Sequence, residues 1–184
     1  MFITILAIVA LIVIFLIGKK FKQLMIGEII IALILGLSVE ILLAPVFRYN
    51  NIKLTLFFPL GAEKIYIGIV LAWGVVLSLA TLMTRFLQKK IIKKSGDVVY
   101  LLCGIFSLLL IGASAEIVGY NLHLWEYTTR IETNIPIFNT PIRPVMGWLF
   151  FGSIFLIVIR VFEDEIEKIK FIKENFNKRK KKML

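Results

Sequence analysis

Residues 27–44 read GEIIIALILGLSVEILLA, an apolar run long enough to cross a bilayer. About 20 apolar residues are needed to span a hydrocarbon core of roughly 30 Å. Similar runs recur, and we predict five transmembrane helices, at residues about 2–17, 25–44, 66–85, 98–119 and 142–161. The runs are continuously apolar rather than alternating, which argues against a transmembrane β-barrel. The sequence therefore predicts an all-α, polytopic membrane protein.

The overall composition agrees with this class. The chain has 184 residues, of which 59% are hydrophobic, and its mean hydropathy is +0.92. A soluble domain of this length would need a polar surface that the sequence lacks. We treat residues 1–161 as a single transmembrane domain. Residues 162–184 carry acidic residues followed by basic ones, so we predict a cytoplasmic helical extension that ends in the basic run 178–182.

The net charge of +10 is distributed as membrane topology requires. Three basic residues follow the first apolar run, five follow the third, and nine lie between residue 160 and the C-terminus, which leaves five on the opposite side. The positive-inside rule then places the N-terminus outside and the C-terminus in the cytoplasm of a cell membrane. Anionic lipid headgroups are the expected partners of this charge, and nucleic acid is not. The first run has its basic residues after it, the reverse of a cleavable signal.

Two segments of the chain resemble each other. Residues 36–41 read GLSVEI and residues 112–117 read GASAEI, so Gly, Ser, Glu and Ile recur 76 positions apart. Scarcer residues recur 75 positions apart, namely Trp73 with Trp148 and Arg85 with Arg160. We predict two parallel two-helix repeats, about 26–86 and 102–161, with the first helix as an extra element. Many secondary transporters carry inverted repeats, so the parallel order makes a transporter component less expected.

The repeated glutamates, Glu40 and Glu116, are the main candidates for a functional site. A carboxyl group inside a membrane span costs a few kcal/mol on insertion scales and is rarely without a role. At 1.5 Å per residue, Glu40 lies about 6 Å from the end of its run, and Trp73 and Trp148 lie roughly 9 Å deep. All four side chains are expected in one shallow outer layer. The glycine one turn before each glutamate leaves room for a neighbouring helix or a ligand.

The second repeat carries more polar residues near this layer. Arg143 lies at the start of the last span and is a candidate partner of Glu116. A carboxyl beside an arginine stays ionised, whereas one among apolar groups keeps its proton and can act as a general acid. We take Glu116 and Arg143 as candidate catalytic residues. The candidate substrate-binding residues are Glu40, Trp73, Trp125, Tyr127 and Trp148.

Simpler roles remain open for each of these residues. A glutamate near the interface can bond to headgroups or to a neighbouring helix and be purely structural. Tryptophans at this depth also form interfacial belts, and Arg85 and Arg160 are most simply anchors whose charges extend to the headgroups. The chain has one histidine and one cysteine and no nucleotide-binding, zinc or nucleophile-elbow motif. We therefore predict neither a metal nor a cofactor.

One part of the second repeat resembles a known family. The pattern consists of Glu116-Ile-Val-Gly119-Tyr120, Trp125-Glu126-Tyr127, Ile135-Pro136, Pro141, Pro144 and Trp148. It is similar in order and spacing to integral membrane carotenoid-biosynthesis proteins of the hydratase type, over about 35 of the 184 residues. The resemblance implies an isoprenoid substrate and protonation of a double bond. It implies that Glu116 is the acid, and that Trp125, Tyr127 and Trp148 face a carbocation. The chain is shorter than expected for that family and has fewer spans.

Three functional hypotheses follow, and the sequence leaves open whether the protein is an enzyme. The first is binding or processing of a lipid or isoprenoid, a small apolar ligand, at the outer Glu and aromatic site. The alternative is a non-enzymatic membrane subunit or scaffold in a homo- or hetero-oligomer, in which the glutamates bond to neighbouring helices. A transporter or channel component is the least favoured, because no charge is predicted at the membrane midplane.

Overall fold

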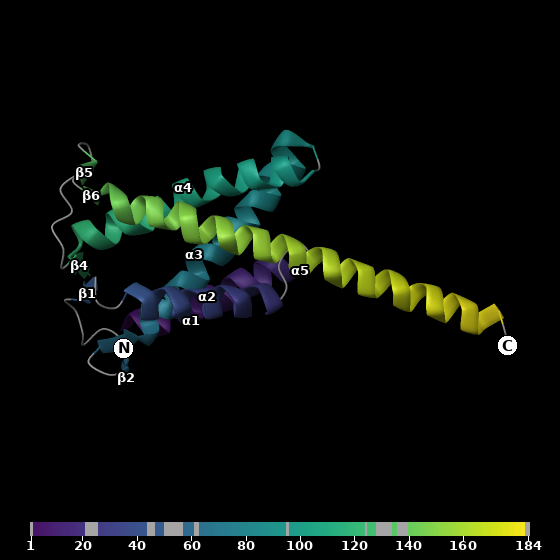
Figure 1. The fold of residues 1–184 in the computed structure, drawn as a ribbon, viewed down its shortest axis with the longest axis horizontal. Coiled ribbons are helices and arrows are strands. Elements are labelled where there is room, and N and C mark those ends of the chain that lie inside the picture. The colour runs from purple at the N-terminus through teal and green to yellow at the C-terminus, as the bar shows by residue number, and fades with distance from the viewer. Residues whose placement is uncertain are drawn as a thin grey trace.

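The computed structural model describes most of the chain, namely residues 2–20, 26–43, 47–49, 57–60, 63–94, 96–123, 125–127, 134–135 and 140–182. Its main elements are the α-helices α1 (Phe2–Lys20), α2 (Ile26–Leu43), α3 (Ile67–Phe86), α4 (Asp97–Asn121) and α5 (Ile142–Lys182). Successive helices run in alternating directions, so α2 and α4 point the same way (Figure 1). The described part of the chain is thus a helical bundle.

The helices have the length and composition of membrane spans. Four of them, α2 to α5, are long and apolar enough to cross a bilayer, and α1 contains a shorter apolar stretch. Large apolar side chains point outward along the bundle, including Ile34, Leu102 and Phe150, whereas serine, threonine and glutamate side chains are buried within it. This distribution suits a lipid surrounding. The predicted all-α, multi-pass membrane fold is confirmed.

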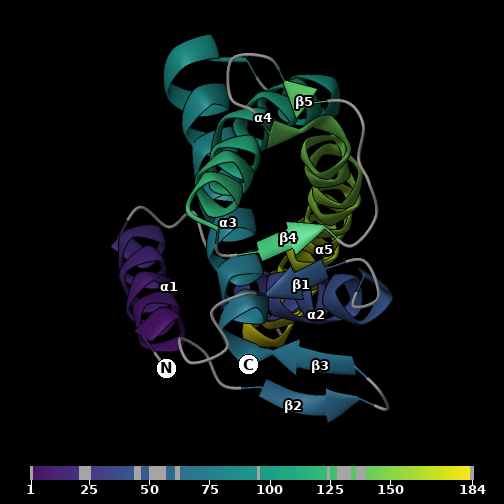
Figure 2. The ribbon, with the colours of Figure 1, turned by 90° about the vertical axis from the view of Figure 1, so that its left-hand side faces the viewer.

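Short strands gather at one end of the bundle, which we call the hairpin end (Figures 1 and 2). They are β1 (Phe47–Tyr49), β2 (Phe57–Leu60), β3 (Glu63–Tyr66), β4 (Trp125–Tyr127), β5 (Asn134–Ile135) and β6 (Thr140–Pro141). The β2–β3 hairpin leads directly into α3, and the β5–β6 hairpin leads directly into α5. β1 and β4 pair antiparallel, with Arg48 opposite Glu126. The two long connections are therefore joined to each other.

The opposite end, which we call the basic end, carries a tight connection between α3 and α4. α3 continues as the π-helical segment η2 (Leu87–Ile92), and Lys93 follows in the left-handed conformation with φ of 57°. Gly96 then begins the turn into α4 with φ of 132°, which an L side chain rarely adopts. Beyond this end α5 continues as a single straight helix, well past the other helices (Figure 1).

The core lies around α3, which packs against α1, α2 and α4. Its largest fully buried side chains include Leu77 of α3, Leu108 of α4, and Phe155, Leu156 and Ile159 of α5. Trp73 and Trp148 belong to the same cluster. A second, smaller cluster joins α1 to α2 through Leu11, Ile14 and Ile29. The centre of the bundle is thus built by the two helix pairs α2–α3 and α4–α5, and α1 covers one side.

Candidate functional site

The two predicted glutamates are buried and bonded in the same way. Glu40 on α2 is 3% exposed and accepts a hydrogen bond from Trp73 Nε1 on α3, at 3.0 Å. Glu116 on α4 is 4% exposed and accepts one from Trp148 Nε1 on α5, at 3.3 Å. Each bond crosses between the two helices of one pair. A buried hydrogen bond contributes about 0.5–1.5 kcal/mol net to stability.

The glycine before each glutamate lets the tryptophan approach. A Cβ atom added at Gly36 would lie 2.5 Å from Trp73 Cβ, which is closer than real Cβ contacts. At Gly112 it would lie 3.0 Å from atoms of the Trp148 ring. Of the two occupants expected above the glycines, a neighbouring helix or a ligand, the structure therefore places the neighbouring helix there.

The two indole rings connect the helix pairs to each other. Trp73 and Trp148 stack with their ring centroids 3.9 Å apart and their planes at 29°. Aromatic pairs of this kind contribute about 0.5–1.5 kcal/mol beyond the burial of their area. We call the set Gly36, Glu40, Trp73, Gly112, Glu116 and Trp148 the Glu–Trp layer. One face of each indole is covered by the other indole, so that face is closed to a ligand.

The other predicted site residues lie nearby in the fold, but their side chains fall outside the described part of the structure. Trp125 and Tyr127 belong to β4, where they pair through the backbone with Tyr49 and Phe47 of β1. Arg143 is the second residue of α5. The expected pairing of Arg143 with Glu116 therefore remains a prediction. The structure brings together Glu40, Trp73, Glu116 and Trp148.

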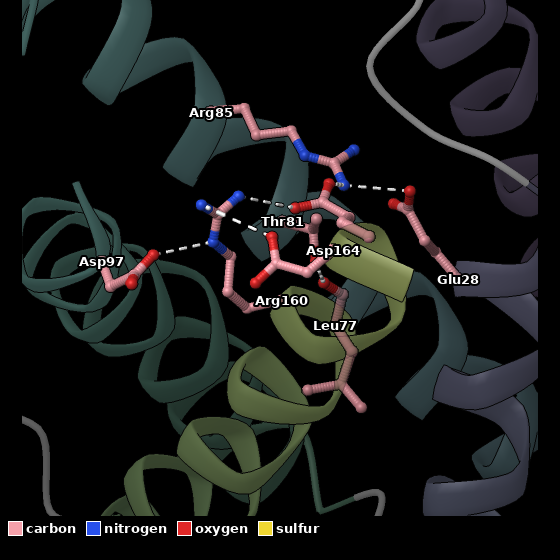
Figure 3. Close-up of polar contacts among 8 residues, drawn as sticks. Glu28, Leu77, Thr81, Arg85, Asp97, Arg160 and Asp164 are labelled. Atoms are coloured by element: carbon pink, nitrogen blue, oxygen red, sulfur yellow. Dashed lines mark hydrogen bonds and ion pairs between the residues drawn. The ribbon is translucent and has the colours of Figure 1, made fainter. Parts of the chain in front are cut away.

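A second polar site at the basic end was missed by the sequence reasoning. Arg85 of α3 forms an ion pair with Glu28 of α2 at 2.9 Å and another with Glu163 of α5 (Figure 3). Its side chain is only 5% exposed. The expectation that Arg85 extends to the headgroups is therefore wrong, because two carboxylates hold its guanidinium inside the bundle.

Arg160 of α5 lies beside this ion pair but is more open. Its Nε donates to Asp97 of α4 at 2.9 Å, and its side chain is 37% exposed (Figure 3). It also approaches Glu163 at 3.6 Å and Asp164 at 3.7 Å. We call this set, together with Tyr100, the basic-end cluster; its members are Glu28, Arg85, Asp97, Tyr100, Arg160, Glu163 and Asp164. The sequence did contain a signal for this site. Glu28 and Arg85 lie near the ends of two successive apolar runs, and antiparallel packing of these runs brings the two residues to the same end.

Three buried polar groups in this region have no hydrogen-bond partner among the described residues: Arg85 Nη1, Tyr100 OH and Ser78 Oγ. Leaving a buried polar group unpaired costs about 1–3 kcal/mol. Other buried hydroxyls nearby follow the usual pattern and donate to the carbonyl oxygen four residues earlier, namely Thr81, Thr84 and Ser107. The basic end is thus both highly charged and incompletely paired.

No family model, no curated protein and no solved structure matches this chain. Within the described ranges, no group of three or more histidine, cysteine, aspartate or glutamate residues is placed to hold a metal ion. Functional inference therefore depends on the geometry of the Glu–Trp layer and of the basic-end cluster.

Proposed function

We propose that the protein is a non-enzymatic membrane scaffold or subunit, in which the Glu–Trp layer joins two helix pairs. The observation that carries this proposal is the use of both carboxyls as acceptors for an indole of the neighbouring helix. The stacked indoles then connect one pair to the other. Two carboxyls engaged in the same way serve the packing of the bundle.

The basic-end cluster supports the same role at the other end. Arg85 binds carboxylates from both α2 and α5, so it ties three helices together. Phe162, at the point where α5 leaves the bundle, packs over Gly27 of α2, where an added Cβ would lie 2.8 Å from the ring. These contacts hold the base of α5 and set the direction of its extension, which is about 30 Å long at 1.5 Å per residue.

The test measures thermal stability of the purified protein in detergent for Trp73→Phe, Trp148→Phe, Glu40→Gln and Glu116→Gln. The tryptophan variants remove the donor and keep an aromatic ring, so we expect a loss of about 0.5–1.5 kcal/mol each. The glutamine variants should lose less, because the amide oxygen still accepts a hydrogen bond. The control is a double-mutant cycle of Trp73→Phe with Glu40→Leu, because each single change removes the bond and the cycle then isolates its pairwise energy. Unchanged melting in all four single variants would refute the scaffold role.

A second candidate function is binding or processing of a lipid or isoprenoid. It is favoured by the pairing of β1 with β4, which brings Phe47 and Tyr49 next to Trp125 and Tyr127 at the hairpin end. Aromatic rings can stabilise a cationic intermediate, and the buried Glu116 would be the acid implied by the carotenoid-hydratase resemblance. A ligand would enter laterally from the bilayer.

Glu116→Gln separates the two candidates. If Glu116 is a catalytic acid, this variant loses turnover of an isoprenoid polyene incorporated in proteoliposomes, while its melting temperature stays that of the wild type. If Glu116 is structural, the polyene is unchanged by either protein, and Glu116→Leu, which removes the acceptor of the Trp148 bond, lowers the melting temperature. Mass spectrometry of the extracted lipid and a thermal melt of the same sample provide both readings.

A further inference from the structure

Three buried polar groups lie in the half of the bundle nearer the basic end. Ser78 is fully buried on α3, Tyr100 on α4 is 2% exposed, and Arg85 on α3 is 4% exposed. None of Ser78 Oγ, Tyr100 OH and Arg85 Nη1 has a hydrogen-bond partner within the described parts of the chain. Buried polar groups in native proteins are nearly always satisfied, by protein or by ordered water. These three groups therefore point to a ligand.

Two of the three groups belong to one cluster, and the third lies on the same face of α3. The guanidinium of Arg160 lies over the Tyr100 ring, 5.9 Å from its centroid, and Arg160 and Arg85 both approach Glu163. Ser78 precedes Arg85 by seven residues, or two helical turns, so both lie on the same face of α3. Ser78 is then about 10 Å further from the basic end than Arg85.

The chemistry of the site selects a small, neutral ligand. The phenol and the serine hydroxyl both donate and accept, whereas the guanidinium only donates, so the ligand must accept hydrogen bonds and can also donate them. The charge of Arg85 is already matched by Glu28 and Glu163, which removes the need for an anion. The near-complete burial of all three side chains leaves no access for a lipid headgroup. Water meets these requirements, and one buried water typically makes about three hydrogen bonds.

We propose that water molecules bind within the basic-end cluster, bridge Arg85 and Tyr100, and extend along α3 to Ser78. Ser78 is the twelfth residue of the 20-residue helix α3, so this water reaches about the middle of the bundle. It ends before Trp73 and the Glu–Trp layer. This water gives the interior of the bundle a polar connection to the basic end, and this property does not depend on the scaffold role.

The first test removes single hydroxyls from the full chain and measures melting in detergent. If water bridges these groups, Tyr100→Phe and Ser78→Ala each lose a bonded hydroxyl and should lower the melting temperature by about 2–4 °C. If the groups are dry, each variant removes an unpaired polar group, and the melting temperature should stay the same or rise. Thr84→Val is the matched control, because the Thr84 hydroxyl bonds only to the carbonyl of its own helix.

The second test detects the water itself by hydroxyl-radical footprinting of the full chain in lipid nanodiscs. Radicals formed from bound water oxidise adjacent side chains even when these are buried. We expect several-fold more oxidation of Tyr100 than of Phe155, which is fully buried in the apolar core, after each is normalised to its rate in the unfolded chain. Cys103, one turn from Tyr100, is a second reporter. Equal protection of Tyr100 and Phe155 would overturn the proposal.

Discussion

Arg85 and Arg160 occupy matching sequence positions but have different surroundings. Arg85 is almost completely buried between Glu28 and Glu163, whereas the Arg160 side chain is 37% exposed and pairs with acids at the surface of the bundle. The position that matches Glu28 in the second repeat, 76 residues later, is Gly104, so Arg160 has no equivalent buried partner there. The difference comes from the neighbouring helix and not from the arginine itself.

We therefore expect Arg85→Met to be far more damaging than Arg160→Met. Removing Arg85 takes the ion-pair partner from the buried Glu28 and leaves Glu163 with its 3.6 Å approach to Arg160, which costs about 3–5 kcal/mol of unfolding free energy. Removing Arg160 breaks solvent-exposed pairs, which contribute about 0–1 kcal/mol. Denaturant unfolding of both variants in the same detergent measures the difference. Similar losses in the two variants would show that the burial of Arg85 has no energetic consequence.

Between helices, a glycine faces a tryptophan at two close approaches, Gly36 with Trp73 and Gly112 with Trp148. The contact is tighter in α2–α3 than in α4–α5, since an added Cβ would lie 2.5 Å from Trp73 Cβ but 3.0 Å from the Trp148 ring. The backbone of α2 therefore rests against the side chain of Trp73. This contact also places the indole N–H within reach of Glu40, one turn further along α2.

Gly36→Ala should separate α2 from α3 and weaken the Glu–Trp layer. Overpacking of this kind typically costs about 1–3 kcal/mol, and Gly112→Ala should cost less. Gly147→Ala in α5 is the control, because no atom lies within 4 Å of its added Cβ and alanine favours a helix by about 0.5–1 kcal/mol. Thermal melting followed by near-ultraviolet circular dichroism reports both stability and the Trp73–Trp148 stack. A wild-type signal in Gly36→Ala would contradict the close approach.

Across the bundle, the two helix pairs make matching contacts. Each pair has a glycine, a glutamate and a tryptophan in the same arrangement. In each pair, a single strand and then a two-stranded hairpin connect the first helix to the second. β1 pairs with β4 so that Phe47 faces Tyr127 and Tyr49 faces Trp125, as two related segments would across a two-fold axis. These contacts support the predicted duplication, which remains a proposal. α1 and the long extension of α5 depart from that symmetry.

The orientation of the bundle is tested by labelling its two ends. Lys93 at the basic end and His123 at the hairpin end are both exposed and lie outside the helices. In a Cys103→Ala background, the positive-inside rule predicts that an impermeant maleimide modifies His123→Cys in intact cells. Lys93→Cys should be modified only after the membrane is opened. The reverse pattern would place the C-terminus outside and invert the predicted topology.

Much of the Glu–Trp layer could be predicted from sequence, because distance along an apolar helix sets depth in the membrane. That argument placed Glu40, Glu116, Trp73 and Trp148 at one level, and they do lie together. It did not predict which atoms meet, because the rotation of each helix about its axis depends on packing. Arg85 shows this limit: its position near the end of an apolar run suggested contact with headgroups, and its rotation toward Glu28 and Glu163 buried it instead.

The sequence by itself determined the membrane-spanning character, the number and approximate bounds of the helices, and the common depth of the repeated glutamates and tryptophans. Hydropathy and the rise per residue act locally along the chain, so no knowledge of contacts was needed. Only the tertiary structure decided that each glutamate binds a tryptophan, that the two indoles stack, and that a buried arginine joins three helices at the basic end. These features depend on which helix faces are turned toward one another, and that is settled by close packing between segments far apart in the chain.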